Sequence, residues 1–145
     1  MQILEINSAA GEVAEPLWLA RAEAVHRELR PKIPSPYVAA MAAIFRDGGR
    51  LCAAVDDEAV LGVALYRVYA DTFNGKKCYV DDLVTTEGRR SSGVGHALIE
   101  HLAARARACG CVNLVLDSGT QRTQAHKFYF REGFVIPSFN FRKAL

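Results

Sequence analysis

The sequence predicts an α+β fold in which a mixed, mostly antiparallel sheet is flanked by about four helices. Three features of the pattern indicate this fold. Apolar residues recur at helical spacing near both ends of the chain, three β-rich segments follow one another in the middle, and a strand–helix–strand crossover comes next. The 145 residues, 50% of them hydrophobic, match the usual size of one domain, so we expect residues 1–145 to form a single domain.

Proline, glycine and turn residues set the expected limits of the elements. A strand at 2–7 precedes a helix that begins at Pro16, because the missing N–H of proline costs nothing in a first turn, and the helix ends before Pro31. Asn74-Gly75 is the strongest turn signal. The other expected elements are a helix at 37–46, strands at 50–56, 59–70 and 76–86, a helix at 94–109, a strand at 112–117, a helix at about 122–132 and two short strands after Gly133.

Charge and residue spacing exclude several classes of protein. A net charge of +2 gives no reason to expect nucleic acid as the main partner. No apolar run reaches the roughly 18 residues that a membrane span needs, and the first residues lack the pattern of a secretion signal, so we expect a cytoplasmic protein. The four cysteines and four histidines lack the spacing of a zinc site, so no metal is expected.

The segment from Asp82 to Leu98 carries the chemistry. A strand enters a loop that contains Arg89, Arg90 and two glycines, and the loop leads directly into a helix. Glycines let backbone N–H groups approach a ligand, and the first turn of a helix offers unpaired N–H donors and partial positive charge, which suit a phosphate. The segment lacks the Gly-Lys-Ser/Thr of a Walker A loop and the third glycine of a dinucleotide fingerprint.

Two motifs resemble those of the GCN5-related N-acetyltransferase (GNAT) superfamily, and the resemblance covers essentially the whole chain. Residues 90–95 (RSSGVG) fit the superfamily's Gln/Arg-x-x-Gly-x-Gly/Ala acetyl-CoA motif, and residues 125–134 (AHKFYFREGF) fit its Ala-x-x-Phe-Tyr-x-x-x-Gly-Phe signature. The two motifs stand at the usual separation, within the matching order of elements.

The resemblance implies acetyl-CoA as co-substrate, bound in a cleft between two splayed strands, 76–86 and 112–117. It implies that a pantetheine arm bonds the main chain of Leu83, Val84 and Thr85. Arg122 stands where the family often has an asparagine beside the cofactor, and we expect it to meet a phosphate or a carbonyl oxygen there. The residues implied to surround the pyrophosphate are Arg90, Ser91, Ser92, Gly93, Val94, Gly95 and His96.

The resemblance also implies direct attack of an amine on the thioester, through a tetrahedral intermediate. Tyr129 matches the family's general acid, which protonates the departing thiolate. For the general base, Asp82 ranks first because it directly precedes the cofactor-binding backbone, and Asp117 ranks second. Asp81 should point to the opposite face of the strand from Asp82 unless a bulge intervenes.

The expected function is transfer of an acetyl group to a primary amine of a small molecule. Two alternatives stay open: an enzyme that acetylates a protein or aminoacyl-tRNA amine, and a non-catalytic acyl-CoA-binding module. The last residues, from Gly133 to Leu145, are similar to the ending of aminoalkylphosphonate N-acetyltransferases. Relatives are often homodimers, and the expected aromatic strand at the C-terminus is a candidate edge for one.

Overall fold

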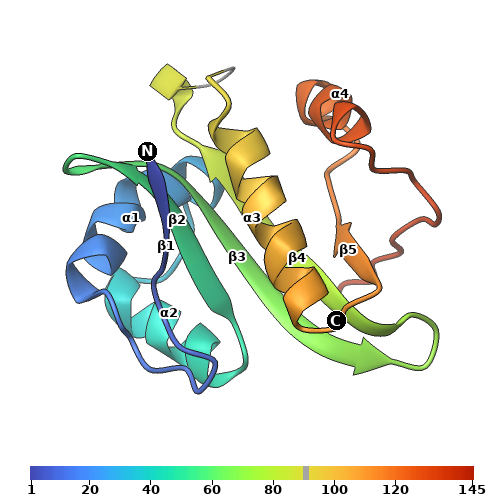
Figure 1. Cartoon of the computed structure of the whole chain (residues 1–145), viewed down its shortest axis with the longest axis horizontal. Helices are drawn as coiled ribbons and strands as arrows, with labels where there is room; N and C mark the ends of the chain where they lie inside the picture. Colours follow the sequence, from blue (N-terminus) through green and yellow to red (C-terminus); the bar gives the residue numbers. More distant parts are fainter. Residues whose placement is uncertain (90–91) are drawn as a thin grey trace. The chain divides into compact units, whose positions relative to one another are not determined.

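The computed structural model describes residues 1–89 and 92–145, and its elements are shown along the chain in Figure 1. The chain divides into two compact units, Met1–Val115 and Leu116–Leu145. The predicted α+β fold class is confirmed. In chain order the elements are β1 (Gln2–Glu5), α1 (Pro16–Leu29), α2 (Tyr37–Arg46), β2 (Arg50–Asp56), β3 (Ala59–Asp71), β4 (Gly75–Thr85), a 3₁₀ turn (Glu87–Arg89), α3 (Val94–Ala108), β5 (Asn113–Leu116) and α4 (Thr123–Arg131).

The sheet has the strand order β1-β2-β3-β4-β5. The pairs β1–β2, β2–β3 and β3–β4 are antiparallel, as expected from the consecutive β-rich segments and the turns between them. At the start of β4, the N–H of Val112 donates to the Lys76 carbonyl oxygen at 2.8 Å, and the Asn113 side chain donates to Asn74. The long strands β3 and β4 form a hairpin, and β4 contains Asp81, Asp82 and the segment from Leu83 to Thr85 (Figure 1).

Helices cover both faces of this sheet. On one face, α1 and α2 form the main core with alternate strand residues such as Leu51, Val63 and Leu65. On the other face, a side chain at Gly62 would meet Val94 and Leu98 of α3. Because Gly62 and Val63 are consecutive in β3, their side-chain positions point to opposite faces, so α3 lies across the sheet from α1 and α2.

The helix limits follow from the residues that the sequence places there. Pro16 occupies the first turn of α1, and the helix ends at Leu29, with Arg30 as C-cap and Pro31 beyond it. Helix α3 begins directly after Gly93, which has a φ of 85°. This left-handed conformation favours glycine, and it allows the chain to turn from the loop into the helix within one residue.

A β-bulge at Asp81 interrupts the alternation of side chains along β4. As a result, side chains before and after the bulge that are two residues apart point to opposite faces of the sheet. Leu65 pairs with Asp82, but the next residue, Tyr66, pairs with Val80, so Asp81 is the extra residue. Paired residues point to the same face, and Leu65 and Tyr66 point to opposite faces. Val80 and Asp82 therefore face opposite sides, and Asp82 lies on the face of α1 and α2.

The second unit contains the end of β5, helix α4 and the C-terminal segment. In α4 the ring of Tyr129 is buried and makes edge-on contacts with Phe128 and Phe134, at centroid distances of 5.4 and 5.7 Å. The glycine signal at Gly133 is confirmed, since α4 ends at Arg131 and Gly133 has a φ of 84°.

The two strands predicted after Gly133 are wrong. Residues 135–145 form no strand, and Phe139 and Phe141 are 83% and 92% exposed. A strand needs a neighbour to pair with, and Pro137 removes one N–H donor from the middle of the segment. The candidate dimer edge that we expected at this end is therefore not a strand in this structure.

Candidate active site

The end of β4 and the start of α3 form the strand–loop–helix unit expected from the sequence. Leu83, Val84 and Thr85 pair with Ala64, Val63 and Gly62 of β3, and Val84 is buried. The Thr86 N–H continues this edge by donating to the Leu61 carbonyl oxygen at 2.9 Å. One side of the segment is thus fixed by β3.

The loop keeps its backbone open at the glycine beside the helix. A side chain built at Gly93 would meet no atom within 4 Å among the described residues. The first turn of α3, which contains Val94, Gly95 and His96, begins directly after this open position. These features fit a diphosphate, because first-turn N–H groups and an uncovered glycine backbone are the donors that a phosphate needs. Ser92 donates to the Arg89 carbonyl oxygen at 2.5 Å, and the predicted contacts of Arg90 and Ser91 lie outside the described residues.

Glu28 of α1 holds the beginning of this loop. Its Oε1 accepts a hydrogen bond from the Thr86 hydroxyl at 2.9 Å, and its Oε2 accepts one from the Glu87 N–H at 3.1 Å. Glu28 could not be recognised from the sequence, because an exposed glutamate on a helix gives no signal of a partner 58 residues away. Helix α1 therefore positions the loop as well as the core.

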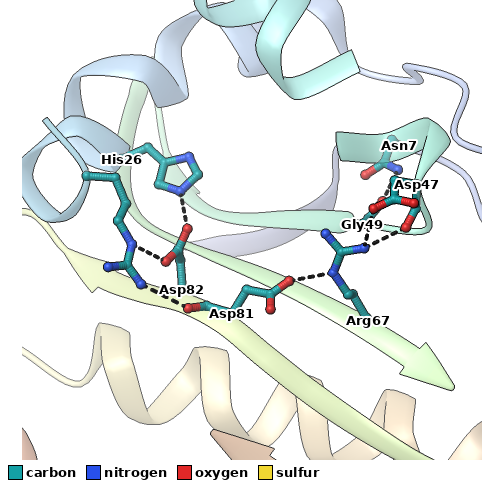
Figure 2. A network of polar contacts seen from close by, with 8 residues as sticks. Asn7, His26, Asp47, Gly49, Arg67, Asp81 and Asp82 are labelled. Carbon is teal, nitrogen blue, oxygen red and sulfur yellow. Dashed lines mark hydrogen bonds and ion pairs between the residues drawn. The ribbon is translucent and has the colours of Figure 1, made fainter. Parts of the chain in front are cut away.

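Asp82 lies at the centre of a buried polar network (Figure 2). Its Oδ2 is 2.9 Å from Nε2 of His26, and its Oδ1 accepts a hydrogen bond from Nε of Arg30 at 2.5 Å. Nδ1 of His26 is 2.9 Å from the Tyr37 hydroxyl. Since a carboxylate only accepts, His26 carries a proton on Nε2 and the Tyr37 hydroxyl donates to Nδ1 when the ring is neutral.

The network keeps Asp82 ionised. Burial acts to raise the pKa of Asp82, but the hydrogen bonds from His26 and Arg30 outweigh it, and the pKa lies below its ordinary value. Burial, together with the charge of Glu23, raises the pKa of Tyr37 far above its ordinary value. A charged carboxylate and a protonated phenol are therefore the states present at neutral pH.

Asp81 lies beside this network on the same face of the sheet. Its Oδ2 accepts a hydrogen bond from Nε of Arg67 at 2.8 Å, and Nη1 of Arg67 donates to the Asp47 carbonyl oxygen at the end of α2 (Figure 2). Arg67 is two residues from Leu65 along β3 and therefore shares its face. Without a bulge, Asp81 and Asp82 were expected to point to opposite faces. The bulge is present, and it brings both side chains to the same face.

The remaining predicted residues belong to the second unit. Burial raises the pKa of Tyr129, and the charge of Arg122 acts in the opposite direction. Arg122 is the N-cap residue of α4. Asp117 follows β5, is exposed, and accepts a hydrogen bond from Asn140 of the C-terminal segment at 2.9 Å. Tyr129, Arg122 and Asp117 thus occupy one unit, whereas Asp82 and the glycine loop occupy the other.

Within the described part of the chain, no cluster of three or more histidine, cysteine or acidic residues is arranged to hold a metal ion. The four cysteines are free thiols, of which Cys52 and Cys78 are buried. Among the same residues, no helix is both long and apolar enough to cross a membrane.

An open α+β sheet whose β4 leads through a glycine loop into a helix is the architecture of the acyl-CoA-dependent N-acetyltransferases. The model of the Acetyltransferase (GNAT) family matches residues 16–134, and the chain belongs to this family. It is an acyltransferase, and its family and CoA-bound structural neighbours support the use of CoA thioesters.

Curated relatives agree with this assignment. The uncharacterised N-acetyltransferase YhdJ of Bacillus subtilis (strain 168) is 37% identical over 106 residues, which cover 65% of this chain and 75% of the relative. An aminoalkylphosphonate N-acetyltransferase of Salmonella typhimurium is 33% identical over 66 residues, 46% of this chain and 43% of that relative. The chain thus matches less than half of the second relative.

Solved structures show the same fold at low sequence identity. A putative acetyltransferase from Agrobacterium tumefaciens str. C58 has a TM-score of 0.77 and 18% identity, and the match covers 100% of both chains. The aminoglycoside N-acetyltransferase AAC(6')-Iy in complex with CoA also has a TM-score of 0.77, with 20% identity over 99% of this chain and 95% of that one.

Proposed function

We propose that this acyltransferase uses acetyl-CoA to acetylate the primary amine of a small molecule. The observation that carries the proposal is the strand–loop–helix unit, in which Gly93 leaves its backbone open directly before α3. The diphosphate of the co-substrate binds there, at the residues from Arg90 to His96, and Arg122 meets a phosphate or a carbonyl oxygen. The main chain of Leu83, Val84 and Thr85 bonds the pantetheine arm between splayed strands.

The chemistry requires the amine to lose a proton and the thiolate to gain one. The amine nitrogen bonds the acetyl carbon directly, through a tetrahedral intermediate, and the carbon–sulfur bond breaks as the intermediate collapses. Tyr129 donates the proton to the sulfur. Its raised pKa means that the phenol is protonated at neutral pH but is not a strengthened acid, so the role is supported by the match of Tyr129 to the family's general acid. Backbone N–H groups near Leu83 or Val84 stabilise the oxyanion.

For the base, Asp82 keeps first rank and Asp117 second. Asp82 directly precedes Leu83, and its lowered pKa supports an ionised carboxylate in the resting enzyme. The same low pKa makes Asp82 a weak acceptor, and both of its oxygens already accept hydrogen bonds, so it takes a proton only by giving up one of those bonds. Asp117 is exposed, and its bond to Asn140 ties it to the C-terminal segment.

A small-molecule acceptor is supported by the names of two relatives. One acts on aminoalkylphosphonates and one on aminoglycosides, both small amines. The test must distinguish this proposal from two alternatives. One is acetylation of a protein or aminoacyl-tRNA amine, and the other is binding of acyl-CoA without catalysis.

The test combines acetyl-CoA binding with thiol release. Acetyl-CoA at about 100 times its dissociation constant adds about 2.7 kcal/mol of stability, a rise in Tm of roughly 5–10 °C for a domain of this size. A panel of small amines should then release free CoA thiol. Binding without release from any amine would support the non-catalytic module and overturn the proposal.

Substitution of Gly93 and Gly95 by valine should abolish the rise in Tm, because side chains would block the backbone N–H groups. Gly110→Val is the matched control: Gly110 lies past the other end of α3, has a similar φ of 75°, and also faces open space among the described residues. It carries the same backbone strain without touching the loop. If the shift persists in the double variant, the loop does not bind the diphosphate.

A further inference from the structure

The guanidinium of Arg30 is held along one edge and exposed along another. Nε donates to Oδ1 of Asp82 at 2.5 Å, and Nη2 donates to the Asp81 carbonyl oxygen at 3.3 Å. Nη1 has no partner among the described residues, and the side chain is 53% exposed. Arginine presents donors in a rigid fork, so fixing Nε and one Nη2 hydrogen orients the remaining Nη1 and Nη2 hydrogens as a pair.

The position of this fork follows from the bulge in β4. The two β4 residues that bind Arg30 are Asp81 and Asp82, and the next residue is Leu83, whose main chain begins the proposed co-substrate segment. A group bound to Arg30 is therefore one or two residues along β4 from the proposed co-substrate segment. Arg30 itself follows α1, whose His26 also anchors Asp82.

Asp81, whose carbonyl oxygen binds Arg30, also offers a carboxylate oxygen that is not bonded to any residue the structure describes. Oδ2 of Asp81 is bonded to Arg67, whereas Oδ1 has no partner among the described residues, and the side chain is 29% exposed. Arg30 is paired with Asp82 and Arg67 with Asp81, so the charges of this site balance, and a ligand whose own charges balance fits it better than a simple anion or a simple cation. A ligand that carries both charges gains at both places, with its anionic group at Arg30 and its ammonium group at Asp81.

We propose that Arg30 binds an oxyanion of the acceptor, so that the acceptor is a small zwitterionic amine that carries a carboxylate or phosphonate group. The inference rests on the proposed function and adds to it the class of acceptor and the residue that selects it. Arg30 binds the substrate at a distance from the reacting nitrogen, and Asp81 orients that nitrogen before it loses its proton.

The experiment measures thiol release at pH 8 with three acceptors of similar length: 2-aminoethylphosphonate, 3-aminopropanoate and propylamine. For the wild type, kcat/KM for the better zwitterion should exceed that for propylamine by about tenfold or more, the worth of a hydrogen-bonded charge. The ratio between the phosphonate and the carboxylate identifies which oxyanion the fork prefers.

Variants separate recognition from structural support. Arg30→Gln also removes one hydrogen bond from Asp82, so some loss is expected for every acceptor, but the loss in kcat/KM should be about tenfold or more larger for the zwitterions than for propylamine. Arg30→Lys keeps the charge without the fork and should recover part of the loss. Arg107→Gln is the matched control, since Arg107 is an exposed arginine in the last turn of α3, on the opposite face of the sheet.

Two results would overturn the inference alone: equal or better use of propylamine by the wild type, or an equal loss for all three acceptors in Arg30→Gln, which would mean that Arg30 acts only through Asp82. The rise in Tm with acetyl-CoA should be unchanged in every variant, which shows that the co-substrate site is intact. Absence of thiol release with every amine tested would instead overturn the proposed function, and the inference with it.

Discussion

Replacement of Asp82 by asparagine tests the network that joins α1 to β4. In the wild type both partners of the carboxylate, His26 Nε2 and Arg30 Nε, are donors. An asparagine offers only one acceptor oxygen, so its amide group must face one of these two donors. Hydrogen bonds to a charged group contribute about 1.5–3 kcal/mol, and the exposure of Arg30 weakens its share. We expect a loss of about 2 kcal/mol, or roughly 4–8 °C in Tm.

The loss should depend on pH in a stated direction. The pKa of Asp82 is lowered in the folded protein, so its ionised form stabilises the fold at every pH above its unfolded value of about 3.9. This contribution disappears as pH falls through the lower, folded pKa. The difference in Tm between wild type and Asp82→Asn should therefore be constant from about pH 6 to 8 and shrink below about pH 4.

Thermal unfolding followed by circular dichroism across this range measures the difference. Asp57→Asn serves as the control, because Asp57 is exposed in the β2–β3 turn with a φ of 50°, a conformation that asparagine also adopts. The control should shift Tm by less than about 2 °C. A difference for Asp82→Asn that persists unchanged at pH 3, or that matches the control at pH 7, would refute the assignment of a stabilising carboxylate.

Three further substitutions test neighbouring parts of the site. Tyr129→Phe should lower kcat at least about tenfold with little change in acetyl-CoA affinity, and unchanged turnover would remove Tyr129 from the mechanism. Tyr37→Phe leaves Nδ1 of His26 without its donor and should cost about 1–2 kcal/mol in urea unfolding; a neutral effect would mean that the bond is not formed. Gly62→Ala places Cβ 2.9 Å from the Val84 carbonyl oxygen and 3.0 Å from Val94. It should therefore lower the free energy of unfolding by about 1–3 kcal/mol and reduce the rise in Tm with acetyl-CoA. Wild-type values for both measurements would show that α3 shifts easily to make room.

Much of the fold could be predicted because the signals are local. Pro16 marks the start of α1, Asn74-Gly75 marks the β3–β4 turn, and Gly93 marks the start of α3. The observed limits of the helices and inner strands differ from the predicted ones by only a residue or so. The prediction of two C-terminal strands was wrong because it depended on a partner that is not local. An apolar pattern forms a strand only where another strand is available to pair with it.

The network around Asp82 could not be predicted, because its contacts connect distant parts of the chain. His26 and Asp82 are 56 residues apart, and a histidine at helical spacing in an apolar stretch reads as a core residue. His26 is indeed buried, but it is also hydrogen-bonded on both ring nitrogens. Sequence pattern predicts the burial of such a residue and is silent about its partners.

The bulge at Asp81 explains how two consecutive acids are linked to two helices of the same layer, Asp82 directly through His26 of α1 and Asp81 through Arg67 of β3, which reaches the end of α2. In a regular strand Asp81 and Asp82 would point to opposite faces, and only one of them would meet α1 and α2. The extra residue brings both carboxylates to one face, where Arg30 follows α1 and Arg67 reaches the end of α2. Two guanidiniums therefore fix the backbone immediately before Leu83 from both sides. Because Arg67 and the pairing with β3 hold this backbone independently of Arg30, loss of the Arg30 guanidinium should leave Leu83 in place, so the acetyl-CoA shift can serve as the control for the Arg30 variants.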